Sequence, residues 1–407
     1  MEQQAINKSQ SKVSFTDGFP WLLIILLACI TALDAMAIDM YLPAFSAISQ
    51  SLQVDSAAIQ YSLSYFIIGL AIGQLIFGPV VDRFGRRKPL LIGILIFSIG
   101  SVIAALAQSF EILLLARFIQ ALGAAAGVVI PRAIISDLFS HQQTAVLFSV
   151  LMQVFMLAPI IAPILGGWIL IHFSWHAIFW CISAISFICL IWSFFSLKES
   201  LKPEKALTHL NISVVLQSYF KELKNLPFMT YTIASGFLFG SFLAYLGGTP
   251  VVILDIFNLS PTQFGYIFAF NAVGFIIFGQ VNTLLLSRIS QYKLAIIGLT
   301  IHVIASLINL ILFLTDQLNV YSFIFLLWLA ISALGLVWGN LTALALQYTQ
   351  DNAGTASALF GIVQYLLGAL LAMLLGLLLQ DPLVKISVIM TICGAISLFS
   401  IIGQKYI

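Results

Sequence analysis

Twelve long apolar segments constrain the fold of this chain more strongly than any other feature. A helix that spans a lipid bilayer needs about 20 predominantly apolar residues. Segments of that length run over about 21–45, 57–79, 89–109, 112–135, 146–171, 177–197, 228–253, 263–286, 294–314, 319–345, 353–379 and 384–403. Because the bilayer core offers no water to backbone groups, such segments cross it as helices. The sequence therefore predicts an all-α membrane protein with twelve transmembrane helices.

Composition agrees with this class and argues against several kinds of site. Hydrophobic residues make up 61% of the 407 residues and charged residues only 8%, whereas about a quarter of a soluble domain is charged. The sequence has no phosphate-binding loop, so we expect no direct use of ATP. His172 and His176 lack the glutamate of a zinc-protease motif, and we interpret them as part of an interfacial belt. We expect no cofactor, no metal ion and no nucleic-acid partner.

The distribution of cationic residues predicts the orientation of the chain. With an even number of helices, both termini lie on the same side of the membrane. Most of the 17 lysines and arginines lie on that side, namely Lys8, Lys12, Arg83, Arg86, Arg87, Lys88, Lys198, Lys202, Lys205, Lys221, Lys224, Arg288, Lys293 and Lys405. Short loops rich in lysine and arginine stay in the cytoplasm. We therefore expect both termini to be cytoplasmic.

A polar linker divides the chain into two halves. Residues 198–227 are rich in lysine and glutamate, and six apolar segments lie on each side of them. A shift of 201 residues places four residues of the second segment on identical residues of the eighth, namely Tyr65, Gly73, Phe77 and Gly78 on Tyr266, Gly274, Phe278 and Gly279. This pattern is typical of transporters with duplicated halves. We predict an N-terminal tail over 1–20, a six-helix bundle over 21–197, a cytoplasmic linker over 198–227 and a second bundle over 228–407.

Two carboxylates interrupt the first apolar segment. Asp34 and Asp39 both lie inside it, although a charged aspartate at the centre of a membrane helix costs about 2.5–3.5 kcal/mol on insertion scales. One interpretation is a functional carboxylate that faces a polar cavity. The other is an acid that stays protonated or is hydrogen-bonded to a neighbouring helix. We favour the functional interpretation, more strongly for Asp39 than for Asp34.

The loop after the second segment carries a recognisable motif. It reads Gly-Pro-Val-Val-Asp-Arg-Phe-Gly-Arg-Arg-Lys over 78–88, which resembles the G-x-x-x-D-R-x-G-R-[RK] signature of the major facilitator superfamily. We interpret this loop as a conformational latch, in which Gly78 allows close helix approach and Asp82 meets a helix N-terminus or an arginine. A loop that only fixes topology would explain the arginines but not the aspartate and the glycines. The motif residues that we assign to the latch are Gly78, Asp82, Arg83, Gly85, Arg86 and Arg87.

The fourth segment contains Arg117 and Gln120, which resemble the R-x-x-Q-G element of the same superfamily, with one residue inserted before the glycine. At ~1.5 Å per residue, Asp39 and Arg117 both lie roughly 8–9 Å below the same membrane boundary. The two side chains can pair if their helices adjoin, and a pair would lower the cost of burying each charge. The alternative is that Arg117 reaches the nearby interface by itself.

The fifth segment contains two prolines followed by two glycines, Pro159, Pro163, Gly166 and Gly167. The segment is similar to the antiporter motif G-P-x-x-G-G, except that Ala162 stands where the first glycine is usual. Prolines kink a helix and small residues allow close packing. The resemblance to antiporters favours efflux over uptake, and a purely structural kink is the alternative.

Together with Asp39–Pro43 and with Pro131–Asp137, which includes Arg132, these motifs resemble the bicyclomycin/chloramphenicol-resistance (Bcr/CflA) branch of drug:proton antiporters over residues 30–180. The resemblance implies a monomeric exporter in the bacterial inner membrane, with two pseudo-symmetric six-helix bundles. It would expel phenicol- or bicyclomycin-like amphiphilic drugs in exchange for protons by alternating access. Our hypothesis is that Asp39 carries the proton, with Asp34 and Arg117 as its partners in coupling.

Polar and aromatic residues on several of the segments are candidates to line a drug cavity. They are Tyr41, Gln60, Tyr61, Gln153, Tyr245, Asn271, Trp338, Asn340 and Gln364. For each of them singly, ordinary contact between helices is at least as good an interpretation. Two other functions stay open, a proton-coupled carrier for a metabolite such as a peptide or amino-acid derivative, and a membrane receptor or intramembrane enzyme on the same scaffold. We do not expect an enzyme, because no nucleophile, base or metal set is clustered.

Overall fold

The computed structural model describes residues 21–139, 141–201, 219–349, 353–378 and 381–404. Over these ranges all the regular structure is helical. The predicted tail over 1–20 and most of the predicted linker lie outside the described residues. Side chains are also left undescribed at 56–57, 82, 141–146, 148–156, 353–355 and 375–378.

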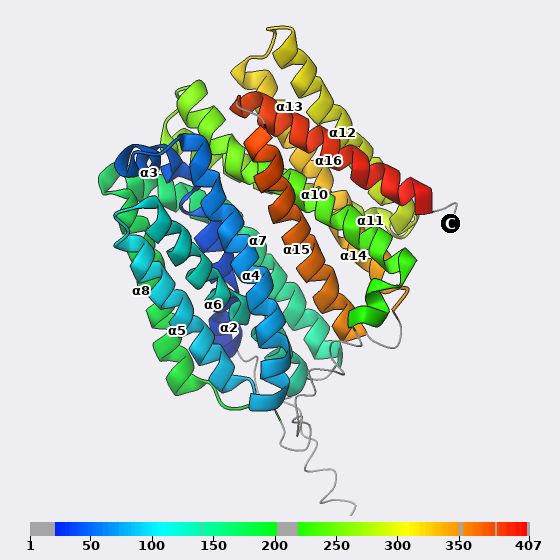
Figure 1. Cartoon of the computed structure of the whole chain (residues 1–407). Coiled ribbons are helices and arrows are strands. Elements are labelled where there is room, and N and C mark those ends of the chain that lie inside the picture. Colours follow the sequence, from blue (N-terminus) through cyan, green and yellow to red (C-terminus); the bar gives the residue numbers. More distant parts are fainter. Residues whose placement is uncertain (1–20, 140, 202–218, 350–352, 379–380, 405–407) are drawn as a thin grey trace, which may run out of the picture.

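The helices form two bundles, which lie side by side in Figure 1. The N-terminal bundle contains α2 (Trp21–Asp39), η2 (Leu42–Ala44), α3 (Phe45–Leu52), α4 (Ser56–Phe84), α5 (Arg87–Ala105), α6 (Phe110–Leu138), α7 (His141–His172) and α8 (Trp175–Ser196). The C-terminal bundle contains α10 (Leu226–Pro250), η4 (Val251–Ile256), α11 (Pro261–Leu285), α12 (Gln291–Leu314), α13 (Val320–Ala333), η5 (Leu334–Leu336), α14 (Trp338–Leu346), α15 (Ala353–Leu378) and α16 (Pro382–Gln404).

The predicted fold class is confirmed. Within the described ranges, eleven helices are long and apolar enough to cross a membrane, and the shorter apolar stretch Leu157–His172 belongs to α7. Large apolar side chains on the outer surface, such as Phe195 and Leu284, are 80% and 75% exposed. Such a surface suits lipid rather than water. The chain is therefore a multi-pass membrane protein.

Three of the predicted segments are each divided into shorter helical pieces. The first consists of α2, η2 and α3, the seventh of α10 and η4, and the tenth of α13, η5 and α14. The piece η4 is a π-helix, a rare element that occurs mostly at functional sites. The divided first and seventh helices lie at equivalent positions in the two bundles, so both bundles break the helix that opens them.

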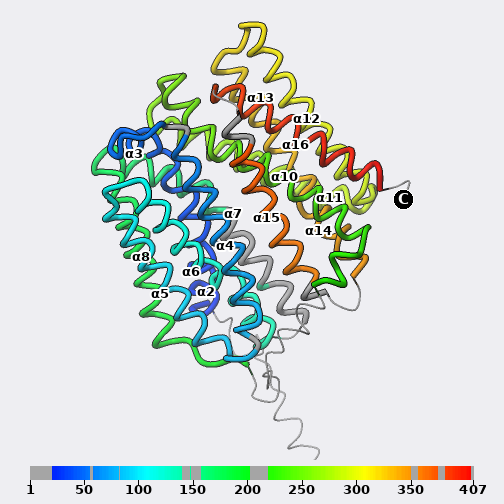
Figure 2. The backbone as a smooth tube through the Cα atoms, in the orientation of Figure 1, coloured from blue at the N-terminus to red at the C-terminus, as the bar shows by residue number. Residues whose placement is uncertain are grey.

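Two pairs of helices make the most extensive contacts between the bundles. Helix α4 packs against α15, and α7 packs against α11; the smooth trace in Figure 2 follows α15 along the N-terminal bundle. The two ends of the molecule differ in the elements that they carry. One end, which we call the α3 end, carries α3 and the turn after α10, and the other, which we call the basic end, carries the turn from Phe84 to Arg87.

Candidate functional site

Both candidate carboxylates are buried on α2, close to the C-terminal bundle. Asp34 and Asp39 are 6% and 5% exposed. Asp39 is the last residue of α2, and Pro43, four residues later, has no N–H to donate to its carbonyl. The helix therefore ends at the carboxylate itself. One carboxylate oxygen of Asp34, Oδ1, has no hydrogen-bond partner among the described residues, which is costly for a buried polar atom.

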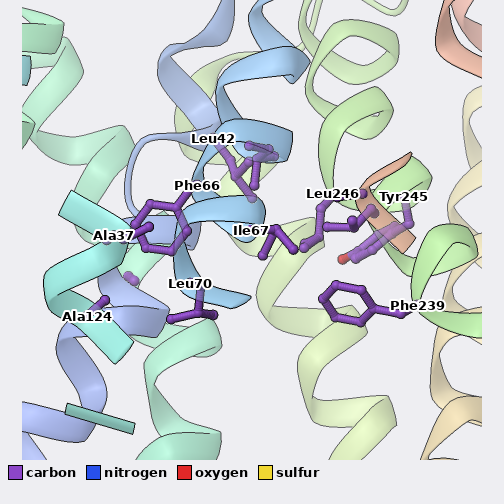
Figure 3. Close-up of a cluster of buried hydrophobic side chains, with 14 of the residues drawn as sticks. Ala37, Leu42, Phe66, Ile67, Leu70, Ala124, Phe239, Tyr245 and Leu246 are labelled. Carbon is purple, nitrogen blue, oxygen red and sulfur yellow. The ribbon is translucent and has the colours of Figure 1, made fainter. Parts of the chain in front are cut away.

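Asp39 faces a polar pair of the C-terminal bundle. Its charge acts on the Tyr245 hydroxyl of α10, and that hydroxyl accepts a hydrogen bond of 3.3 Å from Nδ2 of Asn271 on α11. Figure 3 shows Tyr245 and Phe239 directed from α10 toward Ile67 and Leu70 of α4. The structure thus brings two of the predicted cavity residues, Tyr245 and Asn271, to the contact between the bundles.

Arg117 does not form the ion pair with Asp39 that we considered. The guanidinium is fully buried and lies between aromatic rings, with Cζ 4.4 Å from the ring centre of Tyr41 and 4.3 Å from that of Phe66. Its Nη1 donates a hydrogen bond to Oε1 of Gln120. No carboxylate of the described residues lies within ion-pair distance of Arg117, and its Nε and Nη2 have no hydrogen-bond partner there.

The geometry of antiparallel helices explains why the pair is missing. Thr31 of α2 donates to the carbonyl of Gly127 on α6, at 3.2 Å, and Tyr41 meets Arg117, so α2 and α6 run in opposite directions with Asp39 level with residue 119. Asp39 and Arg117 thus lie within a turn of each other along the two helices. Helical side chains lean toward the N-terminus of their own helix. Asp39 leans toward the basic end and Arg117 toward the α3 end, so they diverge.

The same rule brings Asp34 and Arg132 toward each other. In this register Asp34 of α2 is level with residue 124 of α6. Arg132 is eight residues further along α6, which places it ~12 Å nearer the basic end. Arg132 leans toward the α3 end and Asp34 toward the basic end. Their charges act on one another, and both act on Tyr365 of α15. Tyr365 lies beside Gln74 of α4, across the contact between the bundles. Two carboxylates of α2 thus meet the C-terminal bundle at two levels.

The other predicted cavity residues divide into two groups. Gln60 lines a small cavity between the bundles, with Leu243 and Ala244 of α10, and Trp338 packs on Phe242 with ring centres 5.2 Å apart. The remaining side chains lie elsewhere. Tyr41 is hydrogen-bonded to Ser62 inside the N-terminal bundle. Inside the C-terminal bundle, Asn340 is hydrogen-bonded to Asn282 and Gln364 to Ser235. Tyr61 is half-buried beside Asp55, and the side chain of Gln153 lies outside the described residues.

The loop motif at the basic end is held by two acids that the sequence analysis did not assign to it. Gly85 has φ +86°, a conformation that favours glycine. The carboxylate of Glu199 accepts from the backbone N–H of Arg86 at 2.8 Å and of Arg87 at 3.1 Å. Arg86 Nε donates to Oδ2 of Asp137 at 2.8 Å. Although burial alone would raise the pKa of Glu199, four backbone N–H donors together lower it below its usual value.

The remaining motif residues of this loop differ in how they are placed. Arg87 donates to the carbonyl of Phe194 and lies over that ring, whereas Arg83 is exposed beside the ring of Phe84. The expectation that Gly78 allows close helix approach is wrong for this arrangement, because a Cβ there would meet no described atom within 4 Å. The side chain of Asp82 lies outside the described residues.

The proline–glycine motif of α7 contacts both bundles. A Cβ on Gly166 would overlap the carbonyl oxygen of Met40, next to Asp39, and one on Gly167 would lie 2.7 Å from that of Pro261 at the start of α11. Pro159 and Pro163 lie within α7, and the carbonyl of Pro163 meets Gly265 of α11. Consecutive glycines therefore join the end of α2 to the C-terminal bundle.

Several functional candidates had no clear signal in the sequence. Glu199 follows α8 and Asp137 lies in the last turn of α6, and only the charges of the loop that they hold hinted at acidic partners. Tyr365 lies in an apolar run. Within the described ranges, no group of three or more His, Cys, Asp or Glu side chains lies close enough to hold a metal ion. The site is thus built from carboxylates, arginines and hydroxyls, which are groups that exchange protons and bind polar ligands.

Comparison with known proteins places this arrangement in a family. The profile of the Major Facilitator Superfamily matches residues 27–373. The uncharacterized MFS-type transporter YdgK of Bacillus subtilis (strain 168) is 34% identical over 388 residues, which cover 93% of this chain and 95% of the relative. The bicyclomycin resistance protein homolog of Haemophilus influenzae is 30% identical over 380 residues, with the same two coverages.

More distant relatives and solved structures agree. The multidrug resistance protein MdtL of Shewanella oneidensis is 27% identical over 344 residues, covering 84% of this chain and 85% of the relative. A crystal structure of a D-xylose–proton symporter superposes with a TM-score of 0.74 at 16% identity, over 94% of this chain and 97% of that chain. A bacterial homologue of the lysosomal transporter Spinster, inward-facing and unoccupied, gives a TM-score of 0.75 at 16% identity, over 95% of this chain and 98% of that chain. At such identities these two structures support the fold alone. The chain therefore belongs to the major facilitator superfamily of transporters, and within it to the Bcr/CflA branch.

Proposed function

We propose that this transporter expels amphiphilic antibiotics, such as phenicols or bicyclomycin-like compounds, across the bacterial inner membrane in exchange for protons. The observation that carries the proposal is the pair of buried carboxylates on α2 at the contact between the bundles, one of them with an oxygen that has no partner among the described residues. A buried charge is costly unless it is paired, so each carboxyl gains from binding a proton. The names of the relatives from Haemophilus and Shewanella support drugs as the substrate class.

The proposed orientation places the basic end in the cytoplasm. The described loop residues Arg83, Arg86, Arg87 and Lys88 all lie at that end, as the positive-inside rule requires. The α3 end then faces the periplasm. With this orientation, the proton enters from the periplasm and the drug from the cytoplasm.

Contacts across the bundles support an alternating-access mechanism. At the α3 end, Ser46 of α3 donates a hydrogen bond to Asp255 of η4, and Gly247 of α10 lies against Gln60 of α4. In this state the α3 end is held together. We propose that the drug displaces protons from Asp34 and Asp39 in this state, and that opening of the α3 end exposes both carboxyls to the periplasm, where a proton returns and the drug leaves.

Proton release by inverted membrane vesicles tests the proposal. We would add chloramphenicol to vesicles that hold a respiration-driven pH gradient, and compare wild type with Asp39→Asn and Asp34→Asn. Drug-dependent proton release in wild type that either substitution abolishes is the expected result. Asp316→Asn is a matched control, because Asp316 is exposed in a turn with φ +55°, a conformation that asparagine accepts.

The possible outcomes separate the two carboxylates. Loss of proton release in Asp39→Asn alone would mean that Asp39, at the end of α2, carries the proton. Loss in Asp34→Asn alone would mean that Asp34 carries it. If both variants exported drug against a gradient as well as wild type, neither carboxylate would couple transport and the proposal would fail.

A further inference from the structure

Arg132 is a cation that the proposed transport cycle does not use. It lies within the spanning helix α6, six residues before the helix ends, and its side chain is exposed. Its guanidinium makes no hydrogen bond or ion pair to any described residue, while its charge acts on Asp34 and on Tyr365. Two polar groups of the contact between the bundles thus lie within electrostatic reach of Arg132, which a role in topology alone does not explain. Its five N–H donors thus have no partner among the described residues.

Asp34 supplies a second open position in the same region. It is 6% exposed, and its Oδ1 lacks a partner among the described side chains. The register of α2 and α6 and the lean of their side chains bring Asp34 and Arg132 toward each other from levels ~12 Å apart along the helices. The two groups carry opposite charge. A ligand between them would meet an acceptor at one end and a forked donor at the other.

The C-terminal bundle carries a cluster of aromatic rings that includes Tyr365, on which the charges of Asp34 and Arg132 act. Tyr365 and Trp338 are both half-buried, and each packs on the buried ring of Phe239, with ring centres 5.0 Å and 5.9 Å apart. Phe242 extends the group, 5.2 Å from Trp338. Rings in edge-to-face contact form a rigid apolar surface on which a flat ligand can lie. The charged groups come from one bundle and the aromatic rings from the other.

We propose, on the basis of the proposed antiport, that this site accepts aromatic zwitterions as well as neutral drugs and binds the zwitterions more tightly. Arg132 binds the anionic group of the substrate, Asp34 binds its cationic or hydrogen-bond-donating group, and the ring lies against Trp338 and Tyr365. For this tighter binding, the opposite charges of Arg132 and Asp34 require a substrate with an anionic group at one end and a donor group at the other. A substrate that was only anionic would bind best when Asp34 was protonated, and would therefore move with the proton. A cationic or hydrogen-bond-donating group of the substrate that binds Asp34 competes with the proton for the carboxylate, which is what exchange of drug for proton requires.

The experiment compares three compounds in the inverted-vesicle assay. Norfloxacin carries a carboxylate and an ammonium on an aromatic ring system, its methyl ester keeps the ammonium and the ring but lacks the carboxylate, and chloramphenicol is neutral. In wild type we expect norfloxacin to drive proton release at a lower concentration than its ester. Arg132→Gln should raise the half-saturating concentration of norfloxacin roughly 10-fold or more, since a hydrogen bond to a charged group is lost, and leave the other two unchanged. Arg132→Lys should restore part of the effect.

Each failure has its own signature. If wild type does not distinguish norfloxacin from its ester, or if Arg132→Gln weakens all three compounds equally, Arg132 does not read the anionic group and the inference is wrong. If no compound releases protons from wild-type vesicles, the proposed antiport itself fails. Equal melting temperatures of the purified wild type and Arg132→Gln would confirm that the variant is folded, as expected for an exposed side chain without described hydrogen bonds.

Discussion

At the scale of single residues, Arg117 is an unusual solution to burying a charge. It is fully buried with no carboxylate within ion-pair distance among the described residues. Two ring centres within 4.4 Å of its guanidinium carbon supply the negative faces of Tyr41 and Phe66. Gln120 accepts from it and in turn donates to Ser101 at 2.8 Å. The planar guanidinium suits this setting, since it stacks on rings and holds its proton.

Replacing this arginine with lysine tests the arrangement. Arg117→Lys keeps the charge but loses the flat contact with both rings, so we expect thermal unfolding of the purified protein at a distinctly lower temperature, a loss of about 2 kcal/mol. Arg83→Lys is the control, because Arg83 also lies over a ring, that of Phe84 at 5.0 Å, but is exposed. Equal melting temperatures for the two variants would contradict the role of the rings.

How far the sequence predicts the site is also decided at this scale. Depth along a helix follows from counting residues, and Arg117 does lie within a turn of Asp39. Pairing depends on the direction in which each side chain leans and on which rings surround it, and neither can be read from one sequence without the register of α2 on α6. That register rests on a contact between Thr31 and Gly127, two residues without any charge to draw attention to them.

At the scale of elements, α7 is placed by glycines that meet backbone atoms. Gly166→Ala would bring its Cβ into the carbonyl oxygen of Met40, so α7 and the end of α2 would have to separate. We expect a large loss of folded protein and of transport. Gly78→Ala is the matched control, with no described atom within 4 Å. It should melt at the same or a higher temperature, because alanine favours a helix by about 1 kcal/mol over glycine. Fluorescence-detected size exclusion after heating would measure both, and similar losses would show that the contact at Gly166 is not limiting.

The N-terminus of α5 depends on an acid from another element. Glu199 accepts from the N–H groups of Arg86 and Arg87, and its pKa is lowered by these and two further donors against the opposing effect of burial. A lowered pKa means that the contribution to stability is present above its ordinary 4.5 and is lost as the pH falls below that value.

We therefore expect Glu199→Gln to melt below wild type near neutral pH, by an amount typical of a helix cap, about 1 kcal/mol. The difference in melting temperature should vanish in buffers well below pH 4.5, where wild-type Glu199 is protonated and therefore carries no more charge than glutamine. Asp316→Asn, on an exposed turn, should match wild type throughout. A difference for Glu199→Gln that persisted unchanged into acid would exclude the charge as its cause.

Sequence reasoning succeeds best for these elements, because length and apolarity decide whether a segment spans a bilayer. It does not reveal where a spanning helix breaks. Pro43 accounts for the end of α2, but Pro79 lies inside α4 without ending it. The π-helix after Pro250 has no residue pattern of its own. Breaks of this kind depend on which carbonyls a neighbouring helix can satisfy, which is a property of the packed bundle.

At the scale of the whole molecule, the two bundles touch where their divided first helices end. Ser46 bonds to Asp255, and α3 lies against η4. If this contact must open for the proposed cycle, fixing it stops transport. We expect a variant with Ser46→Cys and Asp255→Cys, in a background without the four native cysteines, to lose drug-driven proton release after treatment with a short thiol cross-linker. Each single-cysteine variant should keep its activity under the same treatment, and full activity of the cross-linked double variant would mean that this contact stays closed throughout.

The contacts of the two glycines of α7 also predict which suppressor mutations a genetic selection can recover. Gly166 and Gly167 each press on a main-chain carbonyl, of Met40 and of Pro261, and a main-chain atom is the same whatever side chain the residue carries. A defect caused by a larger residue at either glycine therefore has no local cure. A selection for drug resistance starting from Gly166→Ala should return reversions, or second-site changes that move a whole helix, and none at Met40.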